Sequence, residues 1–110
     1  MPMLANVARD EEGFFLDPSD WVPELIPVLC EEAELEPTED VLRVVWFVRE
    51  YFEQNQIVPE ARTVLRFLRE TLDAEQATRR YLQSLFPYGY GQQACKIAGM
   101  RKPRKLMLDV

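Results

Sequence analysis

A cysteine followed by a lysine near the C-terminus is the first feature of this sequence that could do chemistry. Cys95 and Lys96 lie within the run Gln93-Ala94-Cys95-Lys96-Ile97-Ala98-Gly99, and more cations follow: Arg101, Lys102, Arg104 and Lys105. The thiolate is the reactive form of cysteine, and neighbouring cations lower the thiol pKa from about 8.5. The pattern therefore predicts an accessible, readily ionised sulfur atom at Cys95. Lys96 and the terminal cations would stabilise its thiolate or dock a partner.

The other cysteine predicts no such chemistry. Cys30 has apolar residues before it and Glu31 and Glu32 after it. Nearby acids raise a thiol pKa, so we expect Cys30 to be inert and at least partly buried. Free cysteines are often buried as small apolar side chains, so that role stays open for Cys95 as well. Pairing of the two cysteines needs Cα atoms closer than about 7 Å, which the sequence does not determine.

Several reaction classes are excluded by composition. The 110 residues include no histidine, which rules out imidazole metal sites, Ser-His triads and histidine acid–base catalysis. No glycine-rich phosphate loop is present. A run of carboxylates near a predicted helix end is typical of a solvated face: Glu31, Glu32, Glu34 and Glu36. We therefore predict no metal and no cofactor.

Charge is distributed unevenly along the chain. Residues 1–95 hold eight arginines and no lysine against 18 acids, a net charge of −10, whereas residues 96–110 carry a net charge of +4. An acidic body opposes binding of nucleic acid over most of its surface. The basic end could dock on its own body, on an acidic partner or on an anion, or it could remain a solvated tail.

Length and composition favour one small cytoplasmic domain. A hydrophobic fraction of 47% over 110 residues predicts a folded globule with a modest core. No apolar run approaches the roughly 20 residues that span a bilayer, and the N-terminus does not resemble a secretory signal. Two cysteines make no disulfide framework, which favours a reducing compartment. We expect a domain over residues 1–99 and a basic arm over 100–110, with no membrane contact.

The hydrophobic pattern predicts a mostly α domain. Residues 3–16 predict a small β-hairpin with Gly13 in its turn. Helices are expected from Ser19 or Asp20 to about residue 33, at 39–54 with Thr38 as the N-cap, at 60–71, at about 74–85 and at 92–98. Gly99 is a natural C-terminal cap for the last helix, and a flexible, extended arm follows from residue 100.

Two of these predicted helices suggest an alternative function. The helices at 39–54 and 60–71 are joined by a short link, as in a helix-turn-helix. The second would expose Arg62, Arg66 and Arg69, which could contact DNA or a partner protein. Helix pairs with this spacing are common, and the acidic body disfavours DNA binding.

With these residues in hand, the sequence resembles the DsrC/TusE family, which comprises the dissimilatory sulfite reductase gamma subunit and a sulfur-relay protein of tRNA thiolation. The most specific piece is Gln93–Gly99, followed by Lys102-Pro103. Other matching pieces are Asp10–Phe14, Trp21, Leu35–Glu39, Phe47–Tyr51, Pro59, Arg62, Tyr81-Leu82 and Leu85–Pro87. The resemblance implies an orthogonal helical bundle with a β-hairpin and a C-terminal arm, and a carrier that presents cysteine sulfur to larger proteins.

One departure from the family pattern limits that role. Full members carry two arm cysteines, and the second would fall at Leu106. A lone Cys95 can form a persulfide or a mixed disulfide, but an internal disulfide would need Cys30. We therefore predict a single-cysteine, sulfur-relay or sulfur-responsive protein, a regulator or partial carrier. Its partners would be sulfur-transfer or sulfite reductase proteins bound through the arm. The alternatives are a DNA-binding regulator and a docked gamma-type subunit of a sulfite reductase.

Overall fold

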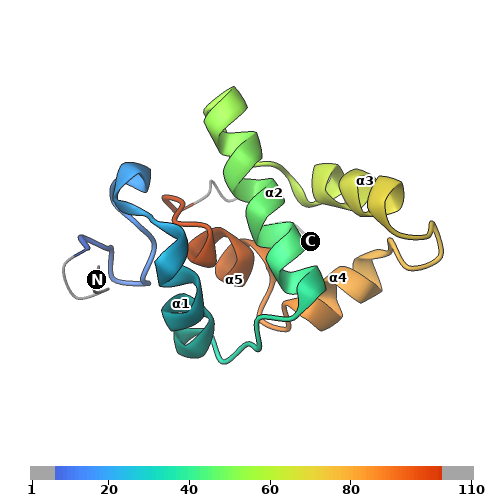
Figure 1. Cartoon of the computed structure of the whole chain (residues 1–110), viewed down its shortest axis with the longest axis horizontal. Coiled ribbons are helices and arrows are strands. Elements are labelled where there is room, and N and C mark those ends of the chain that lie inside the picture. Colours follow the sequence, from blue (N-terminus) through green and yellow to red (C-terminus); the bar gives the residue numbers. More distant parts are fainter. Residues whose placement is uncertain (1–6, 103–110) are drawn as a thin grey trace.

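The computed structural model describes residues 7–102, and within them the regular secondary structure is helical (Figure 1). Two short 3-10 helices, η2 and η3, precede five α-helices. Their bounds are η2 Pro18–Asp20, η3 Pro23–Leu25, α1 Ile26–Glu32, α2 Glu39–Asn55, α3 Ala61–Thr71, α4 Arg79–Leu85 and α5 Tyr90–Ile97. The prediction of a mostly α domain is confirmed. No helix in this range is long and apolar enough to cross a membrane.

Side-chain caps set the start of two helices. The Thr38 hydroxyl accepts a hydrogen bond from the backbone N–H of Val41 and begins α2, as the sequence predicts. Thr78 does the same for α4. At the other end of α2, Gln56 adopts a left-handed conformation with φ of 60°, which ends the helix. Pro27 falls in the first turn of α1, where its missing N–H costs nothing.

The N-terminal β-hairpin predicted over residues 3–16 is not supported: residues 3–6 lie outside the described range, and the remaining residues form no regular strands. One antiparallel bridge, between Arg9 and Phe15, is the only strand-type pairing among the described residues. The Asp10 carboxylate accepts hydrogen bonds from the backbone N–H groups of Glu12 and Phe14, which forms a tight turn. Phe14 and Phe15 are both fully buried. Other segments therefore cover both successive side chains, and the Phe15 N–H donates to the Met100 carbonyl at 3.0 Å.

The fourth helix is shorter than predicted. Residues 73–77 form turns in which the Asp73 carbonyl accepts hydrogen bonds from the N–H groups of Gln76 and Ala77. Helix α4 begins only at Arg79, after the Thr78 cap. Period and propensity did not distinguish this turn from a helix, because the Thr78 cap interrupts a segment whose composition suits a helix throughout.

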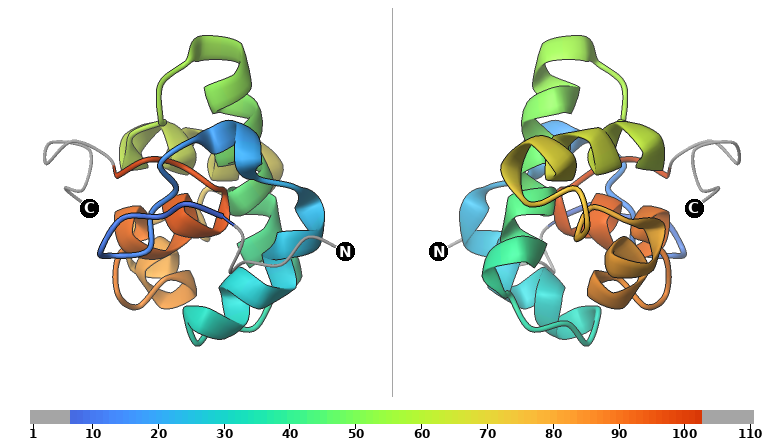
Figure 2. Two further views of the ribbon diagram at one scale, coloured as in Figure 1. Left: turned by 90° about the vertical axis from the view of Figure 1, so that its left-hand side faces the viewer. Right: turned by 90° about the vertical axis from the view of Figure 1, so that its right-hand side faces the viewer.

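Helix α5 lies in the middle of the molecule, with α1 and α2 packed against it (Figure 2). Its buried residues join one hydrophobic core with apolar side chains of every other α-helix. Helix α3 packs on α2 at the far side from α1 (Figure 1). The segment that carries the candidate thiol is therefore the centre of the fold.

Candidate functional site

The predicted reactive thiol is buried. Cys95 has no exposed surface, and neither have Ala94, Ile97 and Ala98 beside it on α5. The expectation of a thiol that outside reagents reach is therefore wrong for this conformation. The reason is the helix itself: α5 turns the side of its axis that carries Cys95 into the core between α1 and α2.

Burial also makes the thiol hard to ionise. Removing Cys95 from water raises its pKa from 9.0 to about 12, because the thiolate loses its hydration. The nearby Tyr90 hydroxyl offsets part of this rise. Tyr90 is itself buried and donates a hydrogen bond of 2.5 Å to the Pro59 carbonyl. The expected lowering of the Cys95 pKa by neighbouring cations is thus contradicted.

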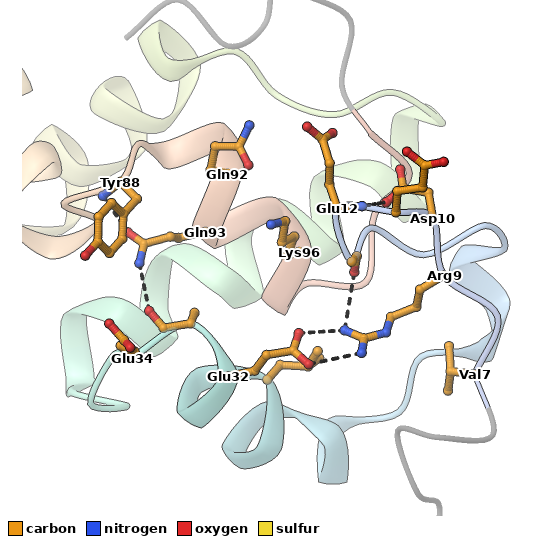
Figure 3. A pocket seen from close by; sticks show the side chains of 14 residues that line it. Val7, Arg9, Asp10, Glu12, Glu32, Glu34, Tyr88, Gln92, Gln93 and Lys96 are labelled. Atoms are coloured by element: carbon orange, nitrogen blue, oxygen red, sulfur yellow. Dashed lines mark hydrogen bonds and ion pairs between the residues drawn. The ribbon is translucent and has the colours of Figure 1, made fainter.

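Lys96 points away from the thiol. Successive residues on an α-helix are turned by about 100°, so sequence neighbours do not share a face. The Lys96 ammonium lies 5.0 Å from the centre of the Phe14 ring and lines an open pocket (Figure 3). The pKa of Glu32, which lines the same pocket, is lowered mainly by the hydrogen bond from Arg9, and the Lys96 charge lowers it further. Cys95 and Lys96 are adjacent in sequence, but the Cys95 side chain lies in the core and the Lys96 side chain lies in the pocket.

The C-terminal end of α5 is closed by main-chain hydrogen bonds. The N–H of Met100 donates to the Cys95 carbonyl at 2.9 Å, and the N–H of Gly99 donates to the Lys96 carbonyl at 3.0 Å. This pair of bonds is the Schellman motif, which needs a left-handed residue after the helix. Gly99 has φ of 75°, and a Cβ there would overlap the Trp21 ring. The predicted role of Gly99 as a helix-terminating residue is confirmed.

Two side chains bind the remaining carbonyls at this end. The Trp21 indole N–H donates to the Ile97 carbonyl at 2.8 Å, and an Arg49 guanidinium nitrogen donates to the Ala98 carbonyl at 3.2 Å. Arg49 also lies 4.6 Å from the Trp21 ring centroid and 3.0 Å from a Glu53 carboxylate oxygen. The cation and the ring support each other in a largely buried position. Every terminal carbonyl of α5 thus has a partner.

Sequence reasoning missed the structural roles of Arg49 and Gln93. Arg49 lies eight residues after Val41 and four after Val45, on the buried stripe of α2, and a charge at that register was the available signal. Gln93 is also buried. Its side-chain carbonyl accepts from the Tyr88 N–H, and its amide donates to the Ala33 carbonyl. No local pattern indicates the partner of Gln93, because Ala33 is 60 residues away.

The described part of the basic segment is attached to the domain. Met100 is fully buried, and its carbonyl accepts a hydrogen bond from the Phe15 N–H at 3.0 Å. The Arg101 side chain donates to the Leu16 carbonyl, and the Lys102 ammonium lies 2.7 Å from a Glu12 carboxylate oxygen. Residues 100–102 therefore follow the alternative in which the basic end docks on its own body, rather than that of a flexible arm. Arg104 and Lys105 lie outside the described residues.

Cys30 is buried, as predicted, on α1. Its thiol pKa is raised, but the cause is loss of hydration rather than the acids that follow it in sequence. Both cysteines are free thiols in this structure.

The open pocket beside Lys96 has a volume of about 770 Å³ and lies between the N-terminal turn, the end of α1 and the exposed side of α5 (Figure 3). Arg9 and Glu32 form a two-pronged ion pair across it, with nitrogen–oxygen distances of 2.6 and 3.0 Å. Several carboxylates surround it: Asp10, Glu11, Glu12, Glu32 and Glu34. Cys95 does not line this pocket, so the pocket gives no route to the thiol.

The three arginines predicted on the exposed face of α3 are there. Arg62, Arg66 and Arg69 all face solvent, and Arg62 pairs with Glu60 at 3.2 Å. Helices α2 and α3 pack against each other, as the two helices of a helix-turn-helix do. Exposure on one helix face is equally expected of an ordinary amphipathic surface helix.

The family model and the curated relatives that match this chain agree with one another. The family described as "DsrC like protein" matches residues 4–107. Sulfurtransferase TusE of Pectobacterium atrosepticum is 36% identical over 100 residues, covering 91% of this chain and 92% of that protein. The sulfurtransferase TusE homolog of Haemophilus influenzae is 32% identical over 102 residues, covering 93% and 94%.

Two solved structures share the fold. The DsrC of Allochromatium vinosum superposes with a TM-score of 0.77 at 41% identity, covering 88% of this chain and 87% of that one. The oxidized gamma-subunit of the dissimilatory sulfite reductase from Archaeoglobus fulgidus gives a TM-score of 0.80 at 27% identity, covering 88% and 89%.

Proposed function

Because the chain belongs to the DsrC-like protein family, we propose that it works in sulfur relay, as a carrier that presents a cysteine-bound sulfur to partner proteins. The observation that carries this proposal is the similarity to sulfurtransferase TusE proteins over about nine tenths of both chains. The curated relatives favour neither a DNA-binding regulator nor a docked reductase subunit. We propose a carrier rather than an enzyme, on the strength of the family match over residues 4–107 and the similarity to TusE proteins.

Cys95 is the sulfur-bearing residue in this proposal. It lies in the Ala-Cys-Lys-Ile-Ala-Gly segment, and cations follow it within the next ten residues. Cys30 is the less suitable thiol, because the segment that follows it is acidic and would repel an anionic sulfur donor, whereas the segment after Cys95 is basic. Burial of Cys95 supports a closed resting state, in which a protonated thiol is protected from oxidation until the site opens.

The cations are then contacts for a partner rather than stabilisers of the resting thiolate. Lys96, Arg101 and Lys102 reach the surface, while Cys95 does not. We propose that sulfur-transfer or sulfite reductase proteins engage the chain through this basic segment and its continuation to Arg104 and Lys105. A cytoplasmic location fits two free thiols in one small chain.

The sulfur transfer itself is a thiol exchange. In the opened state the Cys95 thiol loses its proton to solvent, and the thiolate attacks the outer sulfur of a donor persulfide. The donor sulfur–sulfur bond breaks, and the donor leaves as a thiolate that takes up a proton. One sulfur atom is gained and no external oxidant is consumed. With no cysteine at Leu106, the chain passes this sulfur on and does not close a disulfide along the arm.

Mass spectrometry tests the assignment. The purified chain is incubated for hours at pH 8.5 with a small-molecule persulfide donor and compared with Cys95→Ser and Cys30→Ser. The wild type and Cys30→Ser should gain one sulfur, about 32 Da, while Cys95→Ser should not. Equal gain by all three proteins would refute Cys95 as the carrier residue.

A further inference from the structure

The segment Gly99–Lys102, here called the strap, runs from the end of α5 along the N-terminal turn and is held there at three points. The Met100 carbonyl accepts from the Phe15 N–H at 3.0 Å. The Arg101 side chain donates to the Leu16 carbonyl at 3.1 Å. The Lys102 ammonium pairs with Glu12 at 2.7 Å. A segment that composition marks as a free tail is thus bound to the body through its first four residues.

The strap is joined to the main chain of Cys95 by the Schellman motif. The C-cap here is Ala98, and the motif brings the second residue after that cap next to the residue three positions before it. In this chain those residues are Met100 and Cys95, joined by the hydrogen bond of 2.9 Å between N–H and carbonyl. Both side chains are fully buried in the same core. Lifting the strap breaks this bond and removes Met100 from beside Cys95.

The three attachments differ in strength along the strap. The attachment at Met100 is buried, whereas Lys102 and Glu12 keep 52% and 44% of their side-chain surface exposed. Exposed ion pairs contribute little and exchange readily with solvent or with a competing charge. Release therefore begins at the Lys102 end. Within the chain Lys102 is paired with Glu12 of the acidic turn Asp10–Glu12, whereas Arg101 donates to the Leu16 carbonyl. An acidic partner surface offers carboxylates to both cations.

We propose that the strap is the gate to Cys95, and that an acidic surface of a partner protein opens it by binding Lys102 in place of Glu12 and Arg101 in place of the Leu16 carbonyl. This inference rests on the proposed function only in taking Cys95 as the sulfur site. In this proposal the binding of the partner to the strap also exposes the thiol. The thiol stays covered in the free protein and becomes reachable where sulfur is to be exchanged.

Thiol labelling measures the gate directly. The full chain is treated with a maleimide without denaturant, and the Cys95 adduct is followed by mass spectrometry of its peptide. In Gly99→Ala the new methyl group overlaps the Trp21 ring, so the strap should detach and labelling should accelerate by about tenfold or more. Gly89→Ala is the matched control: φ there is also positive, at 104°, but no atom lies within 4 Å of the added carbon.

Global stability is measured for both variants by urea unfolding, so that labelling through complete unfolding is separated from local opening. Labelling of Gly99→Ala should exceed that of Gly89→Ala by more than their difference in global stability accounts for. The proposal that the strap gates Cys95 is refuted if the difference in labelling rate between the two variants is fully explained by their difference in global stability.

A charge swap tests the outer attachment and remains decisive if Gly99→Ala does not fold. Lys102→Glu should speed Cys95 labelling by about two- to fivefold, as expected for loss of one exposed ion pair. Adding Glu12→Lys should restore the wild-type rate, because the pair is then rebuilt with its charges exchanged. A rate unchanged by Lys102→Glu, or not restored by the swap, contradicts the proposed attachment.

The partner chemistry is probed with a short polyglutamate peptide. It should accelerate Cys95 labelling in the wild type, while a glutamine peptide of equal length should not. The combined variant Arg101→Gln, Lys102→Gln should no longer respond to polyglutamate. Equal effects of the two peptides would refute an acidic trigger. Maleimide labelling reports access to the thiol and not sulfur loading, so failure of the persulfide experiment and failure of the gate remain distinguishable.

Discussion

Replacing the Cys95 thiol should change how the stability of this protein depends on pH. In the folded chain burial raises the Cys95 pKa to about 12, whereas its ordinary value is 9.0. Below pH 9 the thiol is protonated in both the folded and the unfolded chain, so it contributes no pH dependence. Between pH 9 and pH 12 the unfolded chain has lost a proton that the folded chain keeps. Rising pH then favours unfolding.

The size of this effect follows from the two pKa values. Each pH unit between them lowers the free energy of unfolding by about 1.4 kcal/mol. Integration from pH 7 to pH 10 gives a loss of about 1.4 kcal/mol, and the loss reaches about 4 kcal/mol by pH 12. Cys95→Ala removes the titrating group, so this part of the alkaline destabilisation should disappear in the variant.

Urea unfolding followed by tryptophan fluorescence, at pH 7, 9 and 10 with a reducing agent present, measures the difference. At pH 7 Cys95→Ala is less stable than the wild type, because a buried sulfur has been removed. By pH 10 the gap should have narrowed by about 1.4 kcal/mol. Cys30→Ala is a control for the loss of a buried cysteine at pH 7. A gap between wild type and Cys95→Ala that stays constant from pH 7 to pH 10 would refute the buried, protonated thiol.

Two further predictions concern the side chains that hold α5. Gln93→Ala leaves a backbone N–H and a carbonyl without their partners, so it should lower the free energy of unfolding by about 2–3 kcal/mol; Gln92→Ala, one position along, should change it by less than about 0.5 kcal/mol. Arg49→Ala should cost about 2–4 kcal/mol, since a carbonyl bond and a cation–π contact are lost from a buried site, whereas Arg43→Ala should cost under about 1 kcal/mol. Urea titration checks both pairs, and equal effects within either pair would contradict the roles given to Gln93 or Arg49.

Much of the architecture could be predicted because it depends on local chemistry. Thr38 caps α2, and Gly99 ends α5 with the positive φ that a side chain would resist. The hairpin was mispredicted because a single Gly in an acidic turn does not reveal that two consecutive phenylalanines are both buried. The predicted fourth helix was too long because the residues before Thr78 are compatible with a helix, so the sequence does not show that Thr78 caps a helix that begins after it.

The sequence by itself determined the mostly helical class, the absence of histidine and the family resemblance, since each depends on composition or on short-range pattern. The tertiary structure alone decided the state of the thiol. Cys95 and Lys96 are neighbours along the chain, but a helix turn sends one into the core and the other into a pocket. The groups that close the end of α5, Trp21 and Arg49, are distant in sequence. Burial and pKa depend on such long-range packing, which no local pattern encodes.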